Sequence, residues 1–241
     1  MSHPPILLFD FDGVIITQKA LEYSALISLR NKFYRWRNIE NMRLIDCARL
    51  FEESDSSNKL LALKQINKVY QPFIPSIWRR NIFFIKFRRM YPKYEKYETL
   101  KPYLEEILIQ LKKRGIYLGI VSNTSKKRLD YFKKKLNLDK FFSVFVSRDD
   151  TPFRKPNPYP IYFALMKIKK KHNYSINKDK VFYIGDLPAD IECAKKADVK
   201  SIALLSGHGT REDLEKTNPT FLIENIKNII EIEYFKKFLL D

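Results

Sequence analysis

The sequence predicts an α/β fold in which a mainly parallel sheet lies between two layers of helices. Two observations lead to this prediction. Short apolar runs rich in β-branched or aromatic residues recur along the chain, as is typical of buried strands. Between the later runs lie segments whose apolar residues are three or four positions apart, as in amphipathic helices. Alternating strands and helices favour parallel pairing.

Five apolar runs are predicted to be the strands of this sheet. The first lies near the amino terminus, and the other four lie in the second half of the chain. They are Ile6–Phe9, Ile116–Ser122, Phe141–Ser147, Val181–Asp186 and Val199–Leu205.

Three helices are predicted between or beside the later strands, over Leu104–Gly115, Ser125–Leu138 and Asp190–Val199. In each of them the apolar residues fall on one face, which can pack on the sheet. The first ends at Gly115, and glycine is a common residue just after a helix.

Residues 14–100 interrupt this alternation and contain no convincing strand. Their apolar spacing predicts helices over Ala20–Asn38, Met42–Glu53 and Asn58–Tyr70. We therefore predict two domains: a helical domain of residues 14–100, inserted after the first strand, and a main domain of residues 1–13 and 101–241. The inserted segment has 17 Lys or Arg residues against 8 Asp or Glu residues.

The whole chain of 241 residues is strongly basic, with a formal net charge of +17. This charge favours anionic partners such as phosphorylated metabolites, nucleic acids or acidic lipids. A lysine-rich proteome with solvated surfaces explains the charge equally well. Hydrophobic residues make up 45% of the chain, which excludes a disordered or collagen-like protein.

Cysteine content and apolar run lengths indicate the cellular setting. Cys47 and Cys193 are far apart and lack metal-ligand spacing, so we expect neither a disulfide framework nor a zinc site. Asp10 and Asp12 interrupt the first apolar run too early for a signal peptide, and no run approaches the roughly 18 residues of a membrane-spanning helix. We expect a cytoplasmic protein without membrane attachment.

Residues capable of chemistry follow several of the predicted strands. In open α/β sheets, ligands bind beyond the carboxyl ends of the strands. Acidic groups, hydroxyl groups and a lysine are therefore expected to converge at one edge of the sheet. They are Asp10, Asp12 and Gly13 after the first strand, Ser122, Asn123 and Thr124 after the second, Lys155 after the third, and Asp186 and Asp190 after the fourth.

Each of these residues also has an ordinary structural explanation. Asp12-Gly13 is a common turn sequence, and Ser122 or Asp190 can cap a helix. Their joint occurrence at the same strand ends favours a shared site. If the strand period continued, the side chains of Asp10 and Asp12 would point to the same face, where like charges repel. A bound cation would make such a cluster tolerable.

Four short motifs, "DFDGV", "SNT", "RKPNP" and "GDLPAD", occur in this order at the strand ends. Together they resemble the four motifs of the haloacid dehalogenase-like hydrolase superfamily, close to its phosphoglycolate phosphatase-like branch. The resemblance covers residues 1–14 and 100–223. It implies a Rossmann-like three-layer core with a helical cap, and the inserted segment resembles that cap only in position and helix content.

The resemblance also implies a mechanism that uses Mg²⁺. Asp10 would be the nucleophile and a metal ligand, forming an aspartyl-phosphate. Asp12 would bind the metal through its backbone carbonyl, and its side chain, turned toward the leaving group, would be general acid and then base. Asp186 would be the second carboxylate ligand, and Asp190 would orient metal-bound water or Lys155. The phosphoryl group would be held by Ser122, Asn123, Gly13 and Lys155, with Lys155 also neutralising charge in the transition state.

Two positions bear on the type of reaction within the family. Dehalogenase members generally lack an acid where this chain has Asp12, so the resemblance implies hydrolysis of phosphate esters. Leu187 stands where this branch often has Thr, which removes a hydroxyl group beside the metal ligand. No lysine of the inserted segment matches the sugar-phosphate mutases. We therefore expect a Mg²⁺-dependent phosphatase acting on a small phosphorylated metabolite, as a monomer or dimer.

The basic, aromatic-rich stretches 28–38 and 77–97 leave an alternative open. Such stretches can bind nucleic acid by stacking bases and following the phosphate backbone. The rival functions are a nucleic-acid-binding protein with a vestigial core and a phosphatase of nucleic-acid ends. We favour ordinary amphipathic helices with their arginines in water and their large apolar residues packed inside. Those residues are Phe33, Trp36, Trp78, Phe84 and Phe87.

His208, in "SGHGT" after the fifth predicted strand, could be mistaken for a catalytic base. No cysteine or serine nucleophile pattern surrounds it, so we expect a structural role in its loop.

Overall fold

The computed structural model describes residues 5–17, 19–20, 23–24, 71, 74, 76–172 and 175–240. The chain forms two compact units, Met1–Thr17 with Thr99–Asp241, and Gln18–Glu98. The three helices predicted between positions 20 and 70 lie outside the described residues, apart from a few residues at the start of the first.

The first unit is built on a six-stranded sheet in the order β3-β2-β1-β4-β5-β6, in which every neighbouring pair is parallel. This confirms the predicted α/β class, and all five predicted strands are present. The sixth, β6, was not predicted. The strands are β1 (Ile6–Phe9), β2 (Tyr117–Val121), β3 (Val144–Val146), β4 (Val181–Gly185), β5 (Lys200–Leu204) and β6 (Phe221–Ile223).

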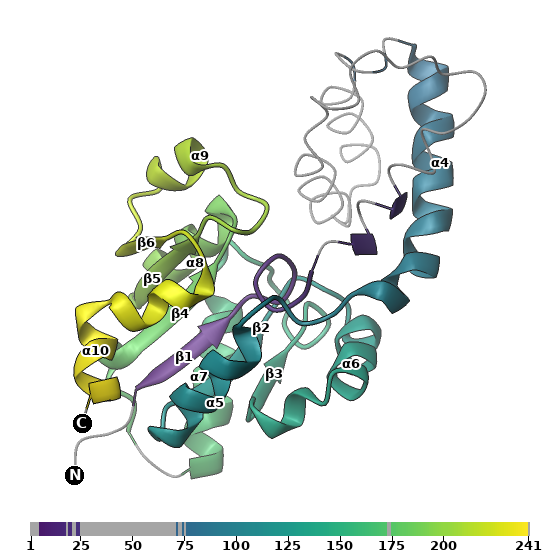
Figure 1. The fold of residues 1–241 in the computed structure, drawn as a ribbon. Helices are drawn as coiled ribbons and strands as arrows, with labels where there is room; N and C mark the ends of the chain where they lie inside the picture. Colours follow the sequence, from purple (N-terminus) through teal and green to yellow (C-terminus); the bar gives the residue numbers. More distant parts are fainter. Residues whose placement is uncertain are drawn as a thin grey trace. The chain divides into compact units, whose positions relative to one another are not determined.

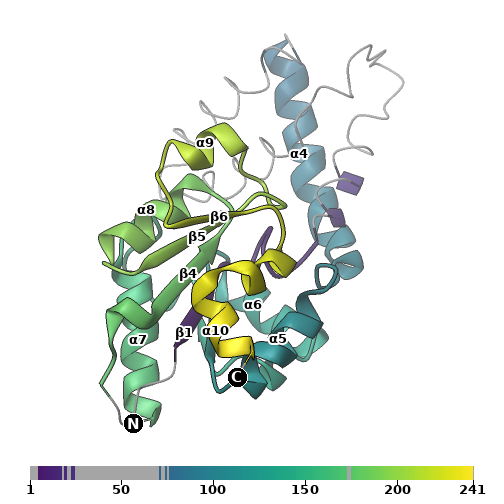
Figure 2. The same ribbon diagram turned by 60° about the vertical axis from the view of Figure 1, so that its left-hand side comes forward.

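Helices cover both faces of the sheet and give three layers (Figures 1 and 2). The helices α5 (Leu104–Lys113), α6 (Lys126–Lys135) and α10 (Glu233–Leu240) pack on one face, and α7 (Tyr159–His172) and α8 (Pro188–Lys196) pack on the other. The helices predicted at α5, α6 and α8 are confirmed, whereas α7 and α10 were not predicted. Shorter helices are α9 (Arg211–Glu215), η3 (Leu138–Lys140), η4 (Lys178–Lys180) and η5 (Ile226–Glu231).

The central strand β1 is buried on both faces, and its alternating side chains enter two different cores. Leu7 and Phe9 belong to the cluster beneath α5, α6 and α10, while Ile6 and Leu8 belong to the cluster beneath α7 and α8. This two-sided burial explains why the strand is uniformly apolar instead of alternating with polar residues.

β1 is also the point at which the order of the strands reverses. The chain continues from β1 to β2 and β3 on one side, and then returns to β4, β5 and β6 on the other. A crevice forms beyond the carboxyl ends of the strands at such a switch point. The segments that follow β1, β2 and β4 are therefore neighbours although they are far apart in sequence.

In the second unit, helix α4 (Ile77–Tyr94) buries one face and exposes the other. Phe84 and Phe87 are buried as predicted, whereas Trp78 is 76% exposed, so that part of the prediction is wrong. Trp78 falls on the opposite side of the helix because residues 80, 84 and 87 share a face at helical spacing. Arg80 is buried, contrary to the prediction for the arginines, and donates to the Ile74 carbonyl at 2.6 Å.

The burial predicted for Phe33 and Trp36 is not tested, because both residues lie outside the described part of the chain. Helix α4 carries six Lys or Arg residues, and neither it nor another described helix combines the length and the apolarity needed to cross a bilayer.

Candidate active site

Asp10 follows β1 directly and is 1% exposed. Its backbone N–H donates to the Ile184 carbonyl at 2.8 Å, so the pairing of β1 with β4 extends to this residue and fixes its position. Oδ1 accepts a hydrogen bond from Lys155 at 2.6 Å, whereas Oδ2 has no hydrogen-bond partner among the described residues. Burial, reinforced by the nearby charges of Asp190 and Asp186 and opposed by Lys155, raises the pKa of Asp10 to about 8.

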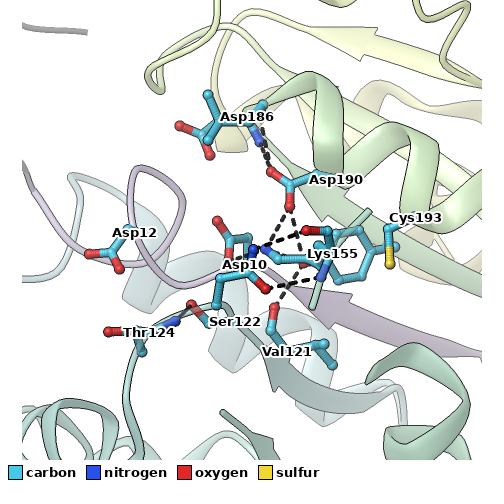
Figure 3. Close-up of polar contacts among 12 residues, drawn as sticks. Asp10, Asp12, Val121, Ser122, Thr124, Lys155, Asp186, Asp190 and Cys193 are labelled. Carbon is cyan, nitrogen blue, oxygen red and sulfur yellow. Dashed lines mark hydrogen bonds and ion pairs between the residues drawn. The ribbon is translucent and has the colours of Figure 1, made fainter. Parts of the chain in front are cut away.

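Lys155 is the centre of the polar contacts at this edge of the sheet (Figure 3). Its buried ammonium group donates to Asp10 Oδ1 and Asp190 Oδ1, each at 2.6 Å, and to the Tyr183 hydroxyl at 3.0 Å. Three acceptors match the three N–H donors of an ammonium group. The Tyr183 hydroxyl in turn donates to the Val121 carbonyl at 2.8 Å, which ties the lysine to β2 as well as to β4.

The side chain of Asn123 holds the loop that carries Lys155. Its Oδ1 accepts from the Lys155 backbone N–H at 3.1 Å, and its Nδ2 donates to the Lys155 carbonyl at 3.3 Å. The family resemblance implied that Asn123 helps to hold the phosphoryl group. The structure shows a different role for its side chain, because this pair of hydrogen bonds sets the position from which Lys155 reaches the acids.

Asp190 lies in the first turn of α8, and both of its carboxylate oxygens are engaged. Oδ1 accepts from Lys155, and Oδ2 accepts from the backbone N–H groups of Asp186 at 3.2 Å and Leu187 at 3.0 Å. Asp190 thus satisfies backbone donors at the start of α8, and Leu187 needs no hydroxyl group for that purpose. Burial raises the pKa of Asp190, although Lys155 opposes the shift.

Asp186, after β4, is fully buried and is held by His208. Its Oδ2 accepts from the His208 backbone N–H at 2.5 Å and lies 2.8 Å from Nδ1 of the same residue. Its Oδ1 has no hydrogen-bond partner among the described residues. Burial disfavours the charge, but the charge and hydrogen bonds of His208, together with Lys101, outweigh it and lower the pKa of Asp186.

Three of the acids form a cluster that fits a divalent cation. Asp10, Asp186 and Asp190 each offer one oxygen atom, and these atoms lie within 4.8 Å of one another. Buried carboxylate oxygens without partners are unfavourable, and a hard cation prefers such oxygen ligands. Both oxygens of Asp190 already accept hydrogen bonds. Oδ2 of Asp10 and Oδ1 of Asp186 have no hydrogen-bond partner among the described residues and are therefore available to a cation.

Asp12 does not share the face of Asp10, contrary to the expectation from strand period (Figure 3). The regular strand ends at Phe9, and Asp12 lies in the turn beyond it. Its Oδ2 accepts from Arg128 Nη1 at 2.7 Å, and the same nitrogen donates to Thr124 Oγ1 at 3.0 Å. The repulsion between adjacent carboxylates is thus relieved by separation and by a guanidinium group.

Gly13 packs directly against Asp186 and His208. Its φ of 74° lies in the left-handed region, which favours glycine. A Cβ atom here would lie 2.1 Å from Asp186 Oδ2 and 2.4 Å from His208 Nδ1. The turn after β1 therefore approaches these groups as closely as it does only because position 13 has no side chain.

Ser122 follows β2 and lies beside Asp10 (Figure 3). It is 4% exposed, its N–H donates to the Val146 carbonyl at 2.9 Å, and its Oγ accepts from the Thr124 N–H at 3.1 Å. Ser125 caps the helix that follows, accepting from the Arg128 N–H at 3.3 Å. Helix α6 begins four residues after Ser122, and N–H groups at the start of a helix favour an anion.

Tyr183, His208 and Arg128 also contact residues of the site. Sequence reasoning did not single out Tyr183 or Arg128, and it gave His208 only a structural role in its loop. For Tyr183 the available signal was a hydroxyl group within an otherwise apolar strand. For His208 it was a position just beyond the carboxyl end of the fifth predicted strand. Arg128 had the weaker signal of lying in the first helical turn after the second motif.

Comparison with known proteins identifies the family. A family model described as haloacid dehalogenase-like hydrolase matches residues 7–204. The chain belongs to this family. As a haloacid dehalogenase-like hydrolase it shares its fold with solved structures of low sequence identity. A haloacid dehalogenase-like family protein from Streptococcus pneumoniae has a TM-score of 0.63 at 15% identity, covering 96% of this chain and 98% of that one.

The names of similar proteins refer to two enzyme activities. A pyrophosphatase PpaX from Oceanobacillus iheyensis is 28% identical over 58% of this chain and 63% of its own length. A phosphoglycolate phosphatase from Pseudomonas syringae pv. syringae is 24% identical over 60% of this chain and 51% of its own length. These matches span about half to two thirds of the relatives. A pyrophosphatase PpaX from Bacillus cereus (strain Q1), at 24% identity, is matched over 94% of both chains.

Proposed function

We propose that this haloacid dehalogenase-like hydrolase is a Mg²⁺-dependent phosphatase that hydrolyses a small phosphomonoester through an aspartyl-phosphate on Asp10. The observation that carries the proposal is the buried Asp10 carboxylate, which forms a cluster with Asp186 and Asp190. One of its oxygens accepts a hydrogen bond from Lys155, and the other has no partner among the described residues. Clustered acids with unpartnered oxygens fit a cation and an attacking carboxylate better than a purely structural ion pair.

In the first half of the reaction, a carboxylate oxygen of Asp10 forms a bond to phosphorus while the bond from phosphorus to the ester oxygen breaks. Asp12 gives a proton to that leaving oxygen. In the second half, Asp12 takes a proton from water, whose oxygen attacks phosphorus and releases phosphate and the Asp10 carboxylate. Asp10 and Asp186 would hold Mg²⁺, which supplies charge neutralisation at the phosphoryl oxygens.

The other residues of the site bind and orient the transferring group. Lys155 neutralises negative charge that develops near Asp10, and its position is fixed by Asn123, Tyr183 and Asp190. Ser122 and the start of α6 supply donors for the phosphoryl oxygens. Phosphoryl transfer depends mainly on such positioning and charge compensation.

We infer that the substrate is a small anionic metabolite. The names of the relatives suggest phosphoglycolate-like acids and also inorganic pyrophosphate, in which a second anion lies close to the transferred phosphoryl group. Nucleoside monophosphates and sugar phosphates are the other classes to test. We also propose that residues 14–100 form a helical cap domain and that the enzyme works in the cytoplasm.

A turnover screen tests this function directly. Purified protein with Mg²⁺ is given phosphoglycolate, pyrophosphate, nucleoside monophosphates and sugar phosphates, and released phosphate is measured. Asp10→Asn protein is the control for contaminating phosphatases. Release of phosphate by the native chain alone supports the proposal, whereas equal release by both proteins, or by neither with every substrate, contradicts it.

A phosphatase acting on nucleic-acid ends is the second candidate. The observation in its favour is α4, in which Trp78 is 76% exposed and six Lys or Arg residues occur without an acidic residue. Exposed aromatic rings among cations are typical of surfaces that bind single strands. Oligonucleotides with a 5′ or 3′ phosphate therefore belong in the same screen.

A further inference from the structure

We propose that His208 is a positioning residue that restricts Asp186 to binding a divalent cation through a single oxygen atom, Oδ1. The inference rests on the proposed function, in which Asp186 is a metal ligand. It gives a role in metal binding to a histidine outside the four motifs.

The two donors of His208 converge on one oxygen. Oδ2 of Asp186 is 2.5 Å from the His208 backbone nitrogen and 2.8 Å from Nδ1. An ionised carboxylate only accepts hydrogen bonds, so Nδ1 carries the hydrogen in this contact. With Oδ2 engaged twice, Oδ1 is the oxygen that is left for a cation, and it has no hydrogen-bond partner among the described residues.

Burial makes this arrangement effective. His208 is 2% exposed and Asp186 is fully buried, so bulk water does not compete for the contact. Hydrogen bonds to a charged group are about twice as strong as those between neutral groups. Rotation of the carboxylate to offer both oxygens to a cation would break two of them.

Close backbone packing holds the imidazole in place. The loop after β5 contacts Asp186 through its backbone as well. The Gly209 N–H donates to the Asp186 carbonyl at 2.9 Å. A Cβ atom at Gly207 would lie 2.1 Å from Asp186 Cβ, and one at Gly13 would lie 2.4 Å from His208 Nδ1. Lys101 anchors the same loop by donating to the Ser206 carbonyl at 2.5 Å. Turns after β1, β4 and β5 thus meet around a single carboxylate.

Loss of the imidazole donor is expected to weaken metal binding. Partners that orient a metal ligand typically contribute about 10- to 100-fold to metal affinity. His208→Ala keeps the backbone N–H but removes the Nδ1 donor. In His208→Asn the side-chain amide nitrogen can take the place of Nδ1, whereas in His208→Gln it reaches farther and does not.

The experiment measures Mg²⁺ binding by isothermal titration calorimetry, without turnover, on the full chain and these three variants. We expect the dissociation constant to rise about 10- to 100-fold in His208→Ala, to return toward the native value in His208→Asn, and to stay raised in His208→Gln. His172→Ala, a change of the same size at the end of α7, is the matched control and should bind like the native chain. Circular dichroism and melting temperature in EDTA report the fold of each variant.

The outcomes separate this inference from the proposed function. Native affinity in His208→Ala, or failure of a folded His208→Asn to bind more tightly than His208→Gln, overturns the role of His208. If His208→Ala does not fold, the comparison of Asn with Gln decides. Absence of Mg²⁺ binding by the native chain, with and without inorganic phosphate, overturns the proposed function itself.

Discussion

Nη1 of Arg128 lies 2.7 Å from Oδ2 of Asp12, and the guanidinium group of Arg128 lies over the rings of Phe11 and Phe132. Stacking on two aromatic rings and donation to Thr124 restrict the arginine to one position. The carboxylate that we propose as general acid and base is therefore held by a group on α6, away from Asp10.

Removal of this ion pair is expected to impair catalysis more than binding. In Arg128→Ala the Asp12 side chain loses its fixed position, and misplacement of a catalytic group costs up to about 100-fold in rate. We expect kcat to fall about 10- to 100-fold while KM changes little, measured with the best substrate of the screen. Lys127→Ala, at the exposed neighbouring position on α6, serves as control. A native kcat in Arg128→Ala would show that Asp12 does not depend on the arginine.

Asp10→Asn should abolish turnover of p-nitrophenyl phosphate. An amide is a poor nucleophile at phosphorus, so we expect a loss of at least about 1000-fold in kcat. The variant keeps the size of the side chain, and its melting temperature reports whether the fold is intact. Substantial activity in a folded Asp10→Asn protein would remove Asp10 from the role of nucleophile.

Metal removal provides a third prediction. Because Oδ2 of Asp10 and Oδ1 of Asp186 lack partners among the described residues, a cation should satisfy both and stabilise the fold. We expect EDTA to stop turnover and to lower the melting temperature, and Mg²⁺ to restore both. Full activity after exhaustive chelation would contradict the proposed mechanism.

The stability of the metal-free protein should fall as pH rises between about 4 and 8. The pKa of Asp10 is raised from 3.8 to about 8, so the folded state binds this proton more tightly than the unfolded state. Stabilisation is then complete below pH 3.8 and is lost as pH rises toward 8, by at most about 1.4 kcal/mol per pH unit for each such group. Asp190 and His208, whose pKa values are also raised, act in the same direction.

Two other groups near Asp10 do not reverse this trend. Lys155 lowers the pKa of Asp10, but that pKa is still about 8. The pKa of Asp186 is lowered from 3.8, so this residue changes the stability only below pH 3.8. Thermal melts in EDTA from pH 5 to pH 8 measure the effect, and saturating Mg²⁺ should flatten it because the cation takes the place of the proton. A melting temperature that rises over this range without metal would contradict the assignment.

The nucleic-acid alternative is tested by gel-shift titration at physiological salt. We expect weak binding, with a dissociation constant above about 1 µM, as for non-specific electrostatic contacts. The variant that tests the surface replaces Arg79, Arg88 and Arg89, which are exposed on α4, and leaves the buried Arg80 in place to protect the fold. Tight binding that this variant loses would favour the nucleic-acid function instead.

The sequence was sufficient to locate the acids of the cluster because parallel strands end at a common edge. Asp10, Ser122, Lys155 and Asp186 were each located because they follow one of the predicted strands. The placement of Asp12 could not be predicted, because strand period does not continue into the turn after Phe9. Local sequence was also insufficient for contacts between distant residues, such as that of His208 with Asp186, which are 22 positions apart.

Helix α4 shows a different limit of sequence reasoning. Its aromatic residues lie on two faces, and only the packing of neighbouring segments decides which face is buried. The rule that large apolar residues pack inside therefore succeeded for Phe84 and Phe87 but failed for Trp78.

The enclosure of the Lys155 ammonium group has a consequence for chemical labelling. An acylating reagent needs an accessible, uncharged amine, and this one is buried and donates to two carboxylates and a tyrosine. Exposed lysines among the described residues will react first, whereas Lys155 will react only when the structure around it opens. Mass spectrometry of its peptide over time would thus report how often this part of the molecule opens.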